Sequence, residues 1–379
     1  MLKPVDDTRM RGKFAETLLN RPQVQVHVAG RATPDDLDYR LVEAFPRICH
    51  HAIFLGSRLS FNRLLAQGRY WRLLRVLQPA VVIVHAPELL PLTLLWQWLG
   101  KGRKFIYDIQ ENYALNVSTQ RVYRGLVRRG VAAALRWVQG LAACRAAAII
   151  LAEASYADEL PFLRKLPPHR VLVLENKYQP LPGQLLPHQP SKFPLPGEPL
   201  RLLFSGTISE LNGILEAFWF AGQLRRAWPG GVQLTVIGFC QQPQLLRQLQ
   251  QLAAENAEWL TLIGGHELVP HAQIVAEIER SHLGLLPYRP HTSTARCRPT
   301  KLFEYLAHGL PIITSPNAQW QLVLQQHGAG LQLDFDQPFD APALVDELRG
   351  TNFYPQGVPI DVLWTEEGKK LWLLLDSLV

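Results

Sequence analysis

Two hydrophobic patterns alternate along this 379-residue chain: short apolar runs, and longer segments with apolar residues three or four positions apart. Residues 80–85 (AVVIVH) and 104–108 (KFIYD) are continuous apolar runs, typical of strands buried in a parallel sheet. Residues 23–30 alternate apolar with polar positions, which predicts a half-buried strand, and residues 90–99 predict a helix. Strands that alternate with helices indicate βαβ units and an α/β fold with a doubly wound sheet.

The same alternation returns in the second half of the chain. Strands are expected at residues 200–204, 232–237, 260–263, 283–286 and 311–314. The stretch before them, residues 179–200, contains seven prolines and therefore cannot hold a regular helix or a central strand. We expect four parts: an N-terminal Rossmann-like domain at 1–180, a proline-rich linker at 181–199, a C-terminal Rossmann-like domain at 200–363, and a helix at 364–379 that packs back toward the N-terminal domain.

The segment of residues 298–315, RPTKLFEYLAHGLPIITS, predicts a helix, a tight stop and a buried strand. Thr300 is a candidate N-cap, and Gly309 suits the left-handed position after the helix. Lys301, Glu304 and His308 recur at i, i+3 and i+7, so they share one helix face. That face could hold a sugar hydroxyl and a phosphate at a helix N-terminus, or it could be a solvated face with an i,i+3 ion pair.

A second helical segment, residues 121–144, begins with four basic residues, which are Arg121, Arg124, Arg128 and Arg129. Leucine, valine and tryptophan side chains follow them at helical spacing. This pattern is typical of a basic amphipathic helix on an anionic membrane surface. The alternative is an ordinary domain helix with solvated arginines.

Composition and charge limit the choice of partners. Hydrophobic residues make up 47% and charged residues 19% of the chain, as in a globular protein. The net charge of +7 favours an anionic partner, either a membrane surface or a phosphorylated substrate. Nucleic acid is not expected, because no nucleic-acid-binding motif accompanies the charge.

Cysteine usage and the first residues indicate the compartment. The four cysteines form no CxxC pair, which argues against a disulfide framework and a zinc site and fits a reducing cytosol. The opening residues are charged and resemble no signal peptide. We therefore expect a cytoplasmic protein, peripheral on the inner face of the plasma membrane if the basic helix binds lipid.

Polar residues follow several predicted strands, and ligands in open α/β sheets lie beyond the carboxyl ends of strands. They are His85, Asp108, Gln110, Glu111, Asn112, Ser205, Gly206, Thr207 and Tyr288. The residues after Thr207 lead through Asn212 and Gly213 into a predicted helix whose free N–H groups would suit a pyrophosphate. Each residue could instead be an ordinary loop or turn residue. No GxGxxG follows a predicted strand and no Walker A motif occurs, which disfavours a dinucleotide oxidoreductase and a P-loop ATPase.

Four segments together resemble the GT-B glycosyltransferases of family 4 over nearly the full chain. PTKLFEYLAHGLP at residues 299–311 is similar to the signature K-[LF]-x-E-Y-[ML]-A-x-G-x-P. HAPELL at 85–90 is similar to H-x-P-E-L-L, YDIQENY at 107–113 to Y-D-x-H-E-x-Y, and FSGT at 204–207 to the glycine-containing loop that opens the second domain.

The resemblance implies a GT-B fold, two Rossmann-like doubly wound domains facing a central cleft. The enzyme would transfer a sugar from a UDP- or GDP-sugar to a glycan or lipid-linked acceptor in surface polysaccharide biosynthesis, with retention and without a metal or other cofactor. The alternatives are a non-hydrolysing nucleotide-sugar epimerase and a GT-B-like scaffold without turnover.

The resemblance also assigns residues. His85 and Glu111 would be catalytic, and Asp108, Gln110 and Asn112 would lie on the acceptor side. Glu304 would bind the ribose, with Lys301 and the loop of Ser205, Gly206 and Thr207 near the diphosphate. The remaining donor-binding residues would be Asn212, Gly213, Tyr288, Arg298 and Leu302. Arg296 stands where the family often has a first glutamate, and we hypothesise that Arg296, Arg298 and Lys301 supply the phosphate-binding charge.

Overall fold

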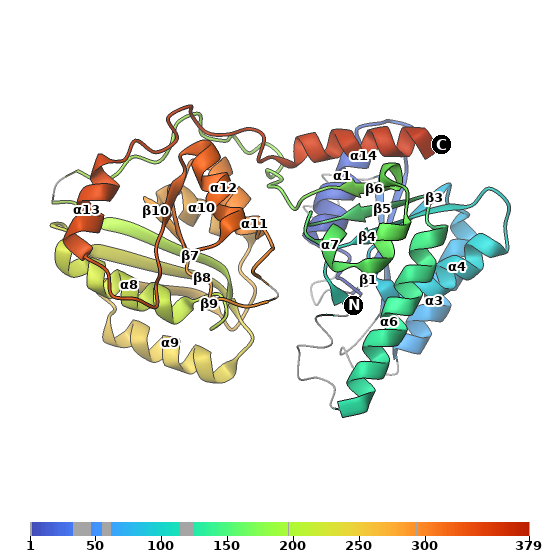
Figure 1. The fold of residues 1–379 in the computed structure, drawn as a ribbon, viewed down its shortest axis with the longest axis horizontal. Coiled ribbons are helices and arrows are strands. Elements are labelled where there is room, and N and C mark those ends of the chain that lie inside the picture. Colours follow the sequence, from blue (N-terminus) through green and yellow to red (C-terminus); the bar gives the residue numbers. More distant parts are fainter. Residues whose placement is uncertain are drawn as a thin grey trace. The chain divides into compact units, whose positions relative to one another are not determined.

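The structure, a computed structural model, describes residues 2–32, 47–54, 62–113, 115, 125–195, 197–292 and 294–378, with the backbone alone at 125–128. The chain divides into two compact units (Figure 1). The first unit contains Met1–Gln179 and Trp364–Val379, and the second contains Pro180–Leu363.

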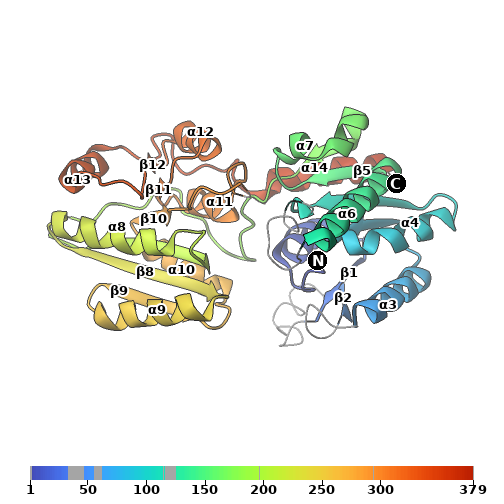
Figure 2. The same cartoon turned by 60° about the horizontal axis from the view of Figure 1, so that its bottom comes forward.

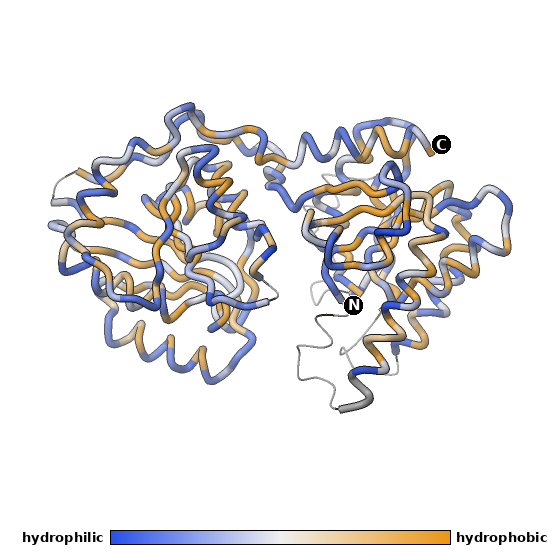
Figure 3. Tube along the Cα trace, viewed as in Figure 1, coloured by the Kyte–Doolittle hydropathy of each residue, from blue (hydrophilic) through white to orange (hydrophobic). Residues whose placement is uncertain are grey.

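The main sheet of the first unit has four parallel strands that lie in chain order. They are β3 (Val81–Val84), β4 (Lys104–Ile109), β5 (Ala148–Leu151) and β6 (Val171–Val173). Alternate residues of these strands enter different cores: Phe105 and Ile149 pack with Trp96, whereas Ile106 and Ile150 pack with Trp364. Burial on both faces explains why these strands are continuous apolar runs in the sequence. Figure 3 shows these strands as apolar segments.

Two further parallel strands of this unit form a separate sheet. They are β1 (Val26–Arg31) and β2 (Ile48–Phe54), which pair with each other and lie beside helix α3 (Figure 2). A single bridge between Pro4 and Arg31 adds the N-terminal segment to the free edge of β1.

Helices cover both faces of the main sheet of the first unit. They are η1 (Thr8–Ala15), α1 (Glu16–Leu18), α3 (Asn62–Leu77), η2 (Pro87–Leu89), α4 (Leu90–Trp98), α6 (Gly125–Arg145), α7 (Tyr156–Glu159), η3 (Pro161–Lys165), η4 (Pro168–Arg170) and α14 (Trp364–Leu378). Although α14 ends the chain, Trp364 and Leu371 pack against Phe14 of η1 in this first unit.

The second unit has one six-stranded parallel sheet in the order β12-β11-β10-β7-β8-β9. The strands are β7 (Leu200–Ile208), β8 (Val232–Cys240), β9 (Leu260–Gly265), β10 (Leu283–Leu286), β11 (Ile312–Thr314) and β12 (Gly330–Gln332). The helices are α8 (Ile214–Ala227), α9 (Pro243–Glu255), α10 (His271–Arg280), α11 (Thr300–Ala307), α12 (Ala318–His327) and α13 (Ala341–Gly350). The chain runs outward from β7 to β9 and then crosses back to β10, so the strand order reverses between β7 and β10.

The proline-rich stretch from Pro180 belongs to the second unit. Its described residues contain no helix or strand. Ser191 donates a backbone hydrogen bond to Gly309, and the Phe193 ring stacks on Phe353 with centroids 5.6 Å apart. The described part of the stretch therefore packs along the second unit.

The structure tests two predicted features of the helix around Lys301, which are its N-cap and the glycine after its end. Gly309 has φ +61°, which confirms the left-handed position after the helix. The N-cap prediction is wrong, because α11 already includes Thr300 and Pro299 occupies the cap position with an extended backbone.

Candidate functional site

A candidate ligand site in the second unit lies where the strand order reverses, at the carboxyl ends of β7 and β10. Ligands of doubly wound sheets bind at such a reversal, because the connecting helices leave in opposite directions and open a crevice. Ser205, Gly206 and Thr207 lie near the carboxyl end of β7, and Tyr288 follows β10. The strand runs further than expected, to Ile208, because β8 remains paired with it to the end.

Gly206 brings the Lys301 side chain onto the end of β7. Gly206 has φ +88°, and a Cβ placed there would lie 2.5 Å from Cε of Lys301. Glycine therefore suits this position for two reasons: it adopts the left-handed backbone without strain, and it leaves room for the Lys301 side chain. The Lys301 ammonium lies 5.0 Å from the ring centroid of Phe204 and 5.6 Å from that of Tyr288. These contacts are cation–π interactions.

The surroundings of Lys301 alter the protonation equilibrium of its side-chain amine. Burial lowers the pKa of Lys301 to about 8, and the negative charge of Glu304 opposes part of that shift. Lys301 forms no salt bridge within the described part of the chain. Near neutral pH most of its ammonium is charged, and a phosphate would supply the anionic partner that it lacks.

The N-terminus of α8 lies next to this loop. Gly213 caps the helix with φ +77°, and a Cβ there would lie 1.7 Å from the carbonyl oxygen of Pro287. Asn212 donates through Nδ2 to the carbonyl oxygen of Thr207 at 2.8 Å, which closes the turn before the helix. The first N–H groups of α8 receive no side-chain cap. Such a helix end attracts an anion.

Glu304 is buried and meets a histidine that the sequence did not single out. Nε2 of His271 lies 2.5 Å from Oε1 of Glu304. His271 begins α10, which approaches α11 only in the folded unit, so helix spacing around Glu304 could not reveal it. This contact orients the carboxylate.

The other predicted donor residues differ in accessibility. Ser205 is buried and its hydroxyl lies 2.8 Å from that of Tyr305. Leu302 is completely buried, so its side chain is part of the core. Arg298 is partly exposed immediately before α11, whereas Thr207 is exposed at the end of β7.

A second polar cluster lies in the first unit at the carboxyl ends of β3 and β4. Asp108 is completely buried and accepts two hydrogen bonds from Arg9, at 2.9 Å from Nε and 2.7 Å from Nη2. Nδ1 of His85 lies 2.7 Å from Oδ2 of Asp108, and Nε2 of Gln110 lies 3.2 Å from the same oxygen. Asp108 therefore orients His85 from inside the protein.

Arg9 is the partner that sequence reasoning missed. It lies at the start of η1, is itself buried, and also donates to the carbonyl oxygen of Leu174 and to Asn176. Burial would by itself raise the pKa of Asp108, but the Arg9 guanidinium and the hydrogen bonds from Arg9 and His85 hold that pKa well below its usual range. The carboxylate stays charged at neutral pH.

The remaining polar residues of this edge make separate contacts. Glu111 is 42% exposed and accepts from Nζ of Lys3 at 2.9 Å, so it faces solvent. Asn112 is buried and donates to Glu159 at 3.0 Å. His85, Gln110 and Asp108 thus form one cluster. Asn112 lies outside this cluster and contacts Glu159 instead.

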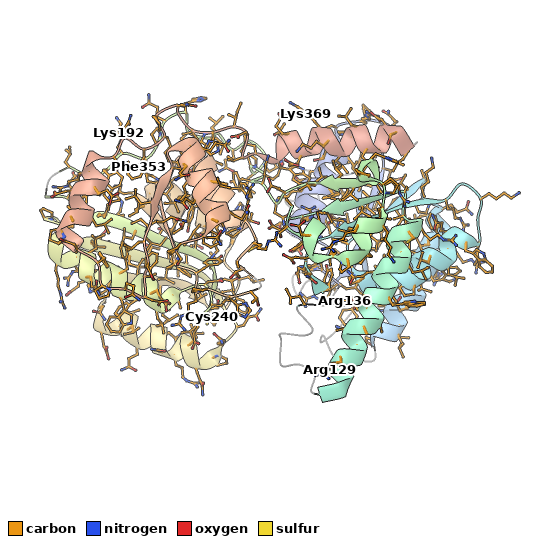
Figure 4. All side chains as sticks on the ribbon, in the orientation of Figure 1. Arg129, Arg136, Lys192, Cys240, Phe353 and Lys369 are labelled. Carbon is orange, nitrogen blue, oxygen red and sulfur yellow. The ribbon has the colours of Figure 1, made fainter. Side chains whose placement is uncertain are left out.

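The predicted membrane-surface arginines fall partly outside the described structure. Arg121 and Arg124 lie outside the described residues, and so does the side chain of Arg128. Arg129 is exposed on α6, and Figure 4 labels it together with Arg136 on that helix. Trp137 of α6 and Trp98 of α4 are 70% and 79% exposed.

The described residues contain neither a membrane-spanning helix nor a metal-binding cluster. None of the helices combines the length and the apolar character required to span a bilayer. No group of three or more histidine, cysteine, aspartate or glutamate side chains there could hold a metal ion.

Comparison with solved structures assigns the architecture. Sucrose-phosphate synthase from Thermosynechococcus elongatus aligns with 96% of this chain and 91% of its own, with TM-score 0.61 and 15% identity. Anabaena HepE in complex with UDP aligns with 93% and 92%, with TM-score 0.57 and 12% identity. A Listeria monocytogenes structure named as a candidate UDP-N-acetylglucosamine 2-epimerase aligns with 98% and 93%, with TM-score 0.62 and 12% identity. The chain has the GT-B fold.

At these identities the comparison shows the fold alone. No protein-family model matches the chain, and no curated protein sequence matches it either.

Proposed function

We propose that the chain is a glycosyltransferase of the family 4 type, which transfers a sugar from a nucleotide-sugar to a glycan or lipid-linked acceptor. The observation that carries this proposal is the placement of Lys301 across Gly206, where the strand order of the second unit reverses. An ammonium that forms no salt bridge among the described residues, beside the uncapped start of α8, suits a diphosphate.

In this proposal Lys301 and the N-terminus of α8 stabilise the nucleoside diphosphate as its bond to the sugar breaks. Charge that develops on the leaving phosphate is then met by fixed positive groups, so no metal is required. Glu304, oriented by His271, accepts hydrogen bonds from the ribose hydroxyls. Arg298 precedes α11 and adds a further cation near its start.

The proposed reaction retains the anomeric configuration. The acceptor oxygen attacks the anomeric carbon from the face that the diphosphate leaves, and the acceptor proton passes to the leaving phosphate. No protein nucleophile is then needed. In the first unit, His85 would bind a sugar hydroxyl through the ring nitrogen that Asp108 does not hold, and Glu111 would contact the acceptor from its exposed position.

The HepE complex with UDP supports a UDP-sugar as the donor. The exposed tryptophans and Arg129 on α4 and α6 support binding at an anionic membrane, where a lipid-linked acceptor for surface polysaccharide would be available. We therefore propose a peripheral position on the cytoplasmic face.

A second candidate is a nucleotide-sugar epimerase, because the Listeria structure shares the fold at a comparable score. The two activities differ in their products. A transferase releases nucleoside diphosphate only when an acceptor is present, whereas an epimerase interconverts the free nucleotide-sugar.

The decisive experiment combines binding with turnover. UDP-, GDP- and ADP-sugars are screened by thermal shift, because a bound ligand stabilises the native state. Glu304→Gln is then compared with Glu347→Gln, a control on an exposed position of α13. We expect Glu304→Gln to weaken donor binding about tenfold or more, since it removes a charged hydrogen-bond acceptor. Equal donor binding by both variants and the unmodified protein would refute the assignment of Glu304.

A further inference from the structure

The sheet of the first unit is interrupted between β1 and β3. These strands belong to two separate parallel sheets, and an apolar cavity of about 560 Å³ lies between them. Val26 and Val28 of β1 line one side of the cavity, and Val82 and Val84 of β3 line the other. Leu2 lies at the boundary of the same cavity.

The second unit of the same chain shows an uninterrupted version of this arrangement. Its order from β9 through β8 and β7 to β10, β11 and β12 has the first strand of the unit, β7, in the centre. The first unit follows the same order: β2 is outermost, β1 is next, and β3 to β6 continue on the far side of the cavity. The cavity therefore occupies the position that β7 holds in the second unit.

The N-terminal segment defines how a strand would enter. Pro4 bridges Arg31 in parallel, Val5 donates its backbone N–H to Arg31, and Arg31 donates to Lys3. Continuing this ladder backward past Leu2 runs along β1 toward Val26, into the cavity. Gly30 permits the approach, because a Cβ there would lie 2.6 Å from the carbonyl oxygen of Lys3.

We propose that the cavity is the seat of one further parallel strand, an extended apolar segment of about five or six residues that runs into Leu2 from its amino side. This strand would pair with β1 on one edge and β3 on the other and would join the two sheets into one. The proposal is independent of the transferase activity, because it concerns only the first unit.

Hydrogen bonding favours a peptide strand over a lipid chain as the occupant. Each parallel strand directs backbone N–H and C=O groups to both of its edges, and buried groups of this kind need partners. A hydrocarbon would fill the volume but leave these groups unpaired, which is unfavourable. The strand should be apolar on both faces, because Phe14 and Trp372 bound the cavity together with Tyr70 and Leu74 of α3.

The strand would also support the polar cluster of this unit. It would lead directly into Lys3, which pairs with Glu111, and then into Arg9, which pairs with Asp108. Pairing of the segment with two neighbouring strands would hold these cations at the sheet edge.

The test adds such a segment to the chain. Five residues with the sequence of Ala80 to Val84, AVVIV, are placed directly before Leu2 after a new initiating methionine. A matched control carries the same extension with prolines at its second and fourth positions. Proline has no backbone N–H and therefore cannot donate a hydrogen bond to a neighbouring strand. Thermal unfolding and amide hydrogen exchange are measured for both and for the unmodified chain.

We expect the apolar extension to raise the melting temperature of the first unit by about 5 °C or more and to slow exchange at β1 and β3 amides about tenfold or more. Amides of β8 serve as an internal reference and should not change. The proline control should behave as the unmodified chain does.

Two results would overturn the proposal. One is unchanged exchange at β1 and β3 with the apolar extension, or equal protection by the proline control. The other is stabilisation of both unmodified and extended chains by a monomeric alkyl maltoside, which would make the cavity a hydrocarbon site. Failure of donor binding would affect neither readout.

Discussion

Replacing Arg9 by methionine should strongly destabilise the first unit. The Arg9 and Asp108 side chains are only 4% and 0% exposed, and methionine keeps the apolar volume while removing both hydrogen bonds to the carboxylate. Asp108 would keep its contacts with His85 and Gln110 but lose its only fixed cation among the described residues. Breaking a buried pair costs about 3–5 kcal/mol, so the melting temperature of this unit should fall by about 6–20 °C.

Thermal and urea unfolding followed by circular dichroism would measure this change. Arg21→Met is the matched control, because Arg21 pairs with Asp376 at the surface of the same unit, and it should leave melting nearly unchanged. UDP-sugar affinity should stay the same in Arg9→Met at temperatures where the protein is folded, because the proposed donor-binding residues lie in the second unit.

A double-mutant cycle with Asp108→Asn isolates the charge effect. Arg9→Met should cost clearly less in the Asp108→Asn background, since no buried anion is then left uncompensated. The folded-state pKa of Asp108 lies below its unfolded value, so this stabilisation is present above about pH 4 and is lost on acidification. The difference between the unmodified protein and Arg9→Met should therefore shrink below that pH. A cost for Arg9→Met under about 1 kcal/mol, or an equal cost in both backgrounds, would refute the reasoning.

Three further predictions concern the proposed donor site around Gly206 and Lys301 and the surface of α6. Gly206→Ala should weaken UDP-sugar binding about tenfold or more by calorimetry, because a left-handed alanine is strained by about 1–2 kcal/mol and its methyl group displaces Lys301; unchanged affinity would contradict this role. Donor affinity should fall as pH rises through about 8, where Lys301 loses its proton, and Lys301→Arg should remove this dependence; an identical pH profile in that variant would assign the titration elsewhere. Binding to anionic liposomes should weaken with salt and fall in Trp137→Ala and in Arg129→Glu, whereas salt-insensitive or absent binding would argue against a membrane surface.

The local pattern of apolar and turn residues in the sequence predicted much of the fold. The continuous apolar runs predicted β3 and β4, since strands covered on both faces cannot alternate in polarity. The glycine and proline after α11 predicted its end, because only a left-handed residue fits there. The segment around Glu304 indicated the GT-B fold only through its resemblance, together with three other segments, to the family 4 glycosyltransferases.

Other features depend on residues far apart in the chain. Arg9 and Asp108 are 99 positions apart, and His271 and Glu304 are 33 apart, so no periodicity links them. That Leu302 binds the donor stays a prediction; its side chain lies in the core, because the motif does not specify which way each side of α11 faces.

The amino-acid sequence by itself therefore indicated many of the strands, among them β3, β4 and β7, since their apolar runs and flanking turn residues lie within a few positions. It did not predict β2 or β12. Only the tertiary structure decided which cation meets which carboxylate, how Lys301 lies across Gly206, and where the sheet of the first unit opens between β1 and β3. The physical reason is that burial, electrostatic pairing and strand neighbours are set when distant segments pack together, and these terms control charge and ligand access.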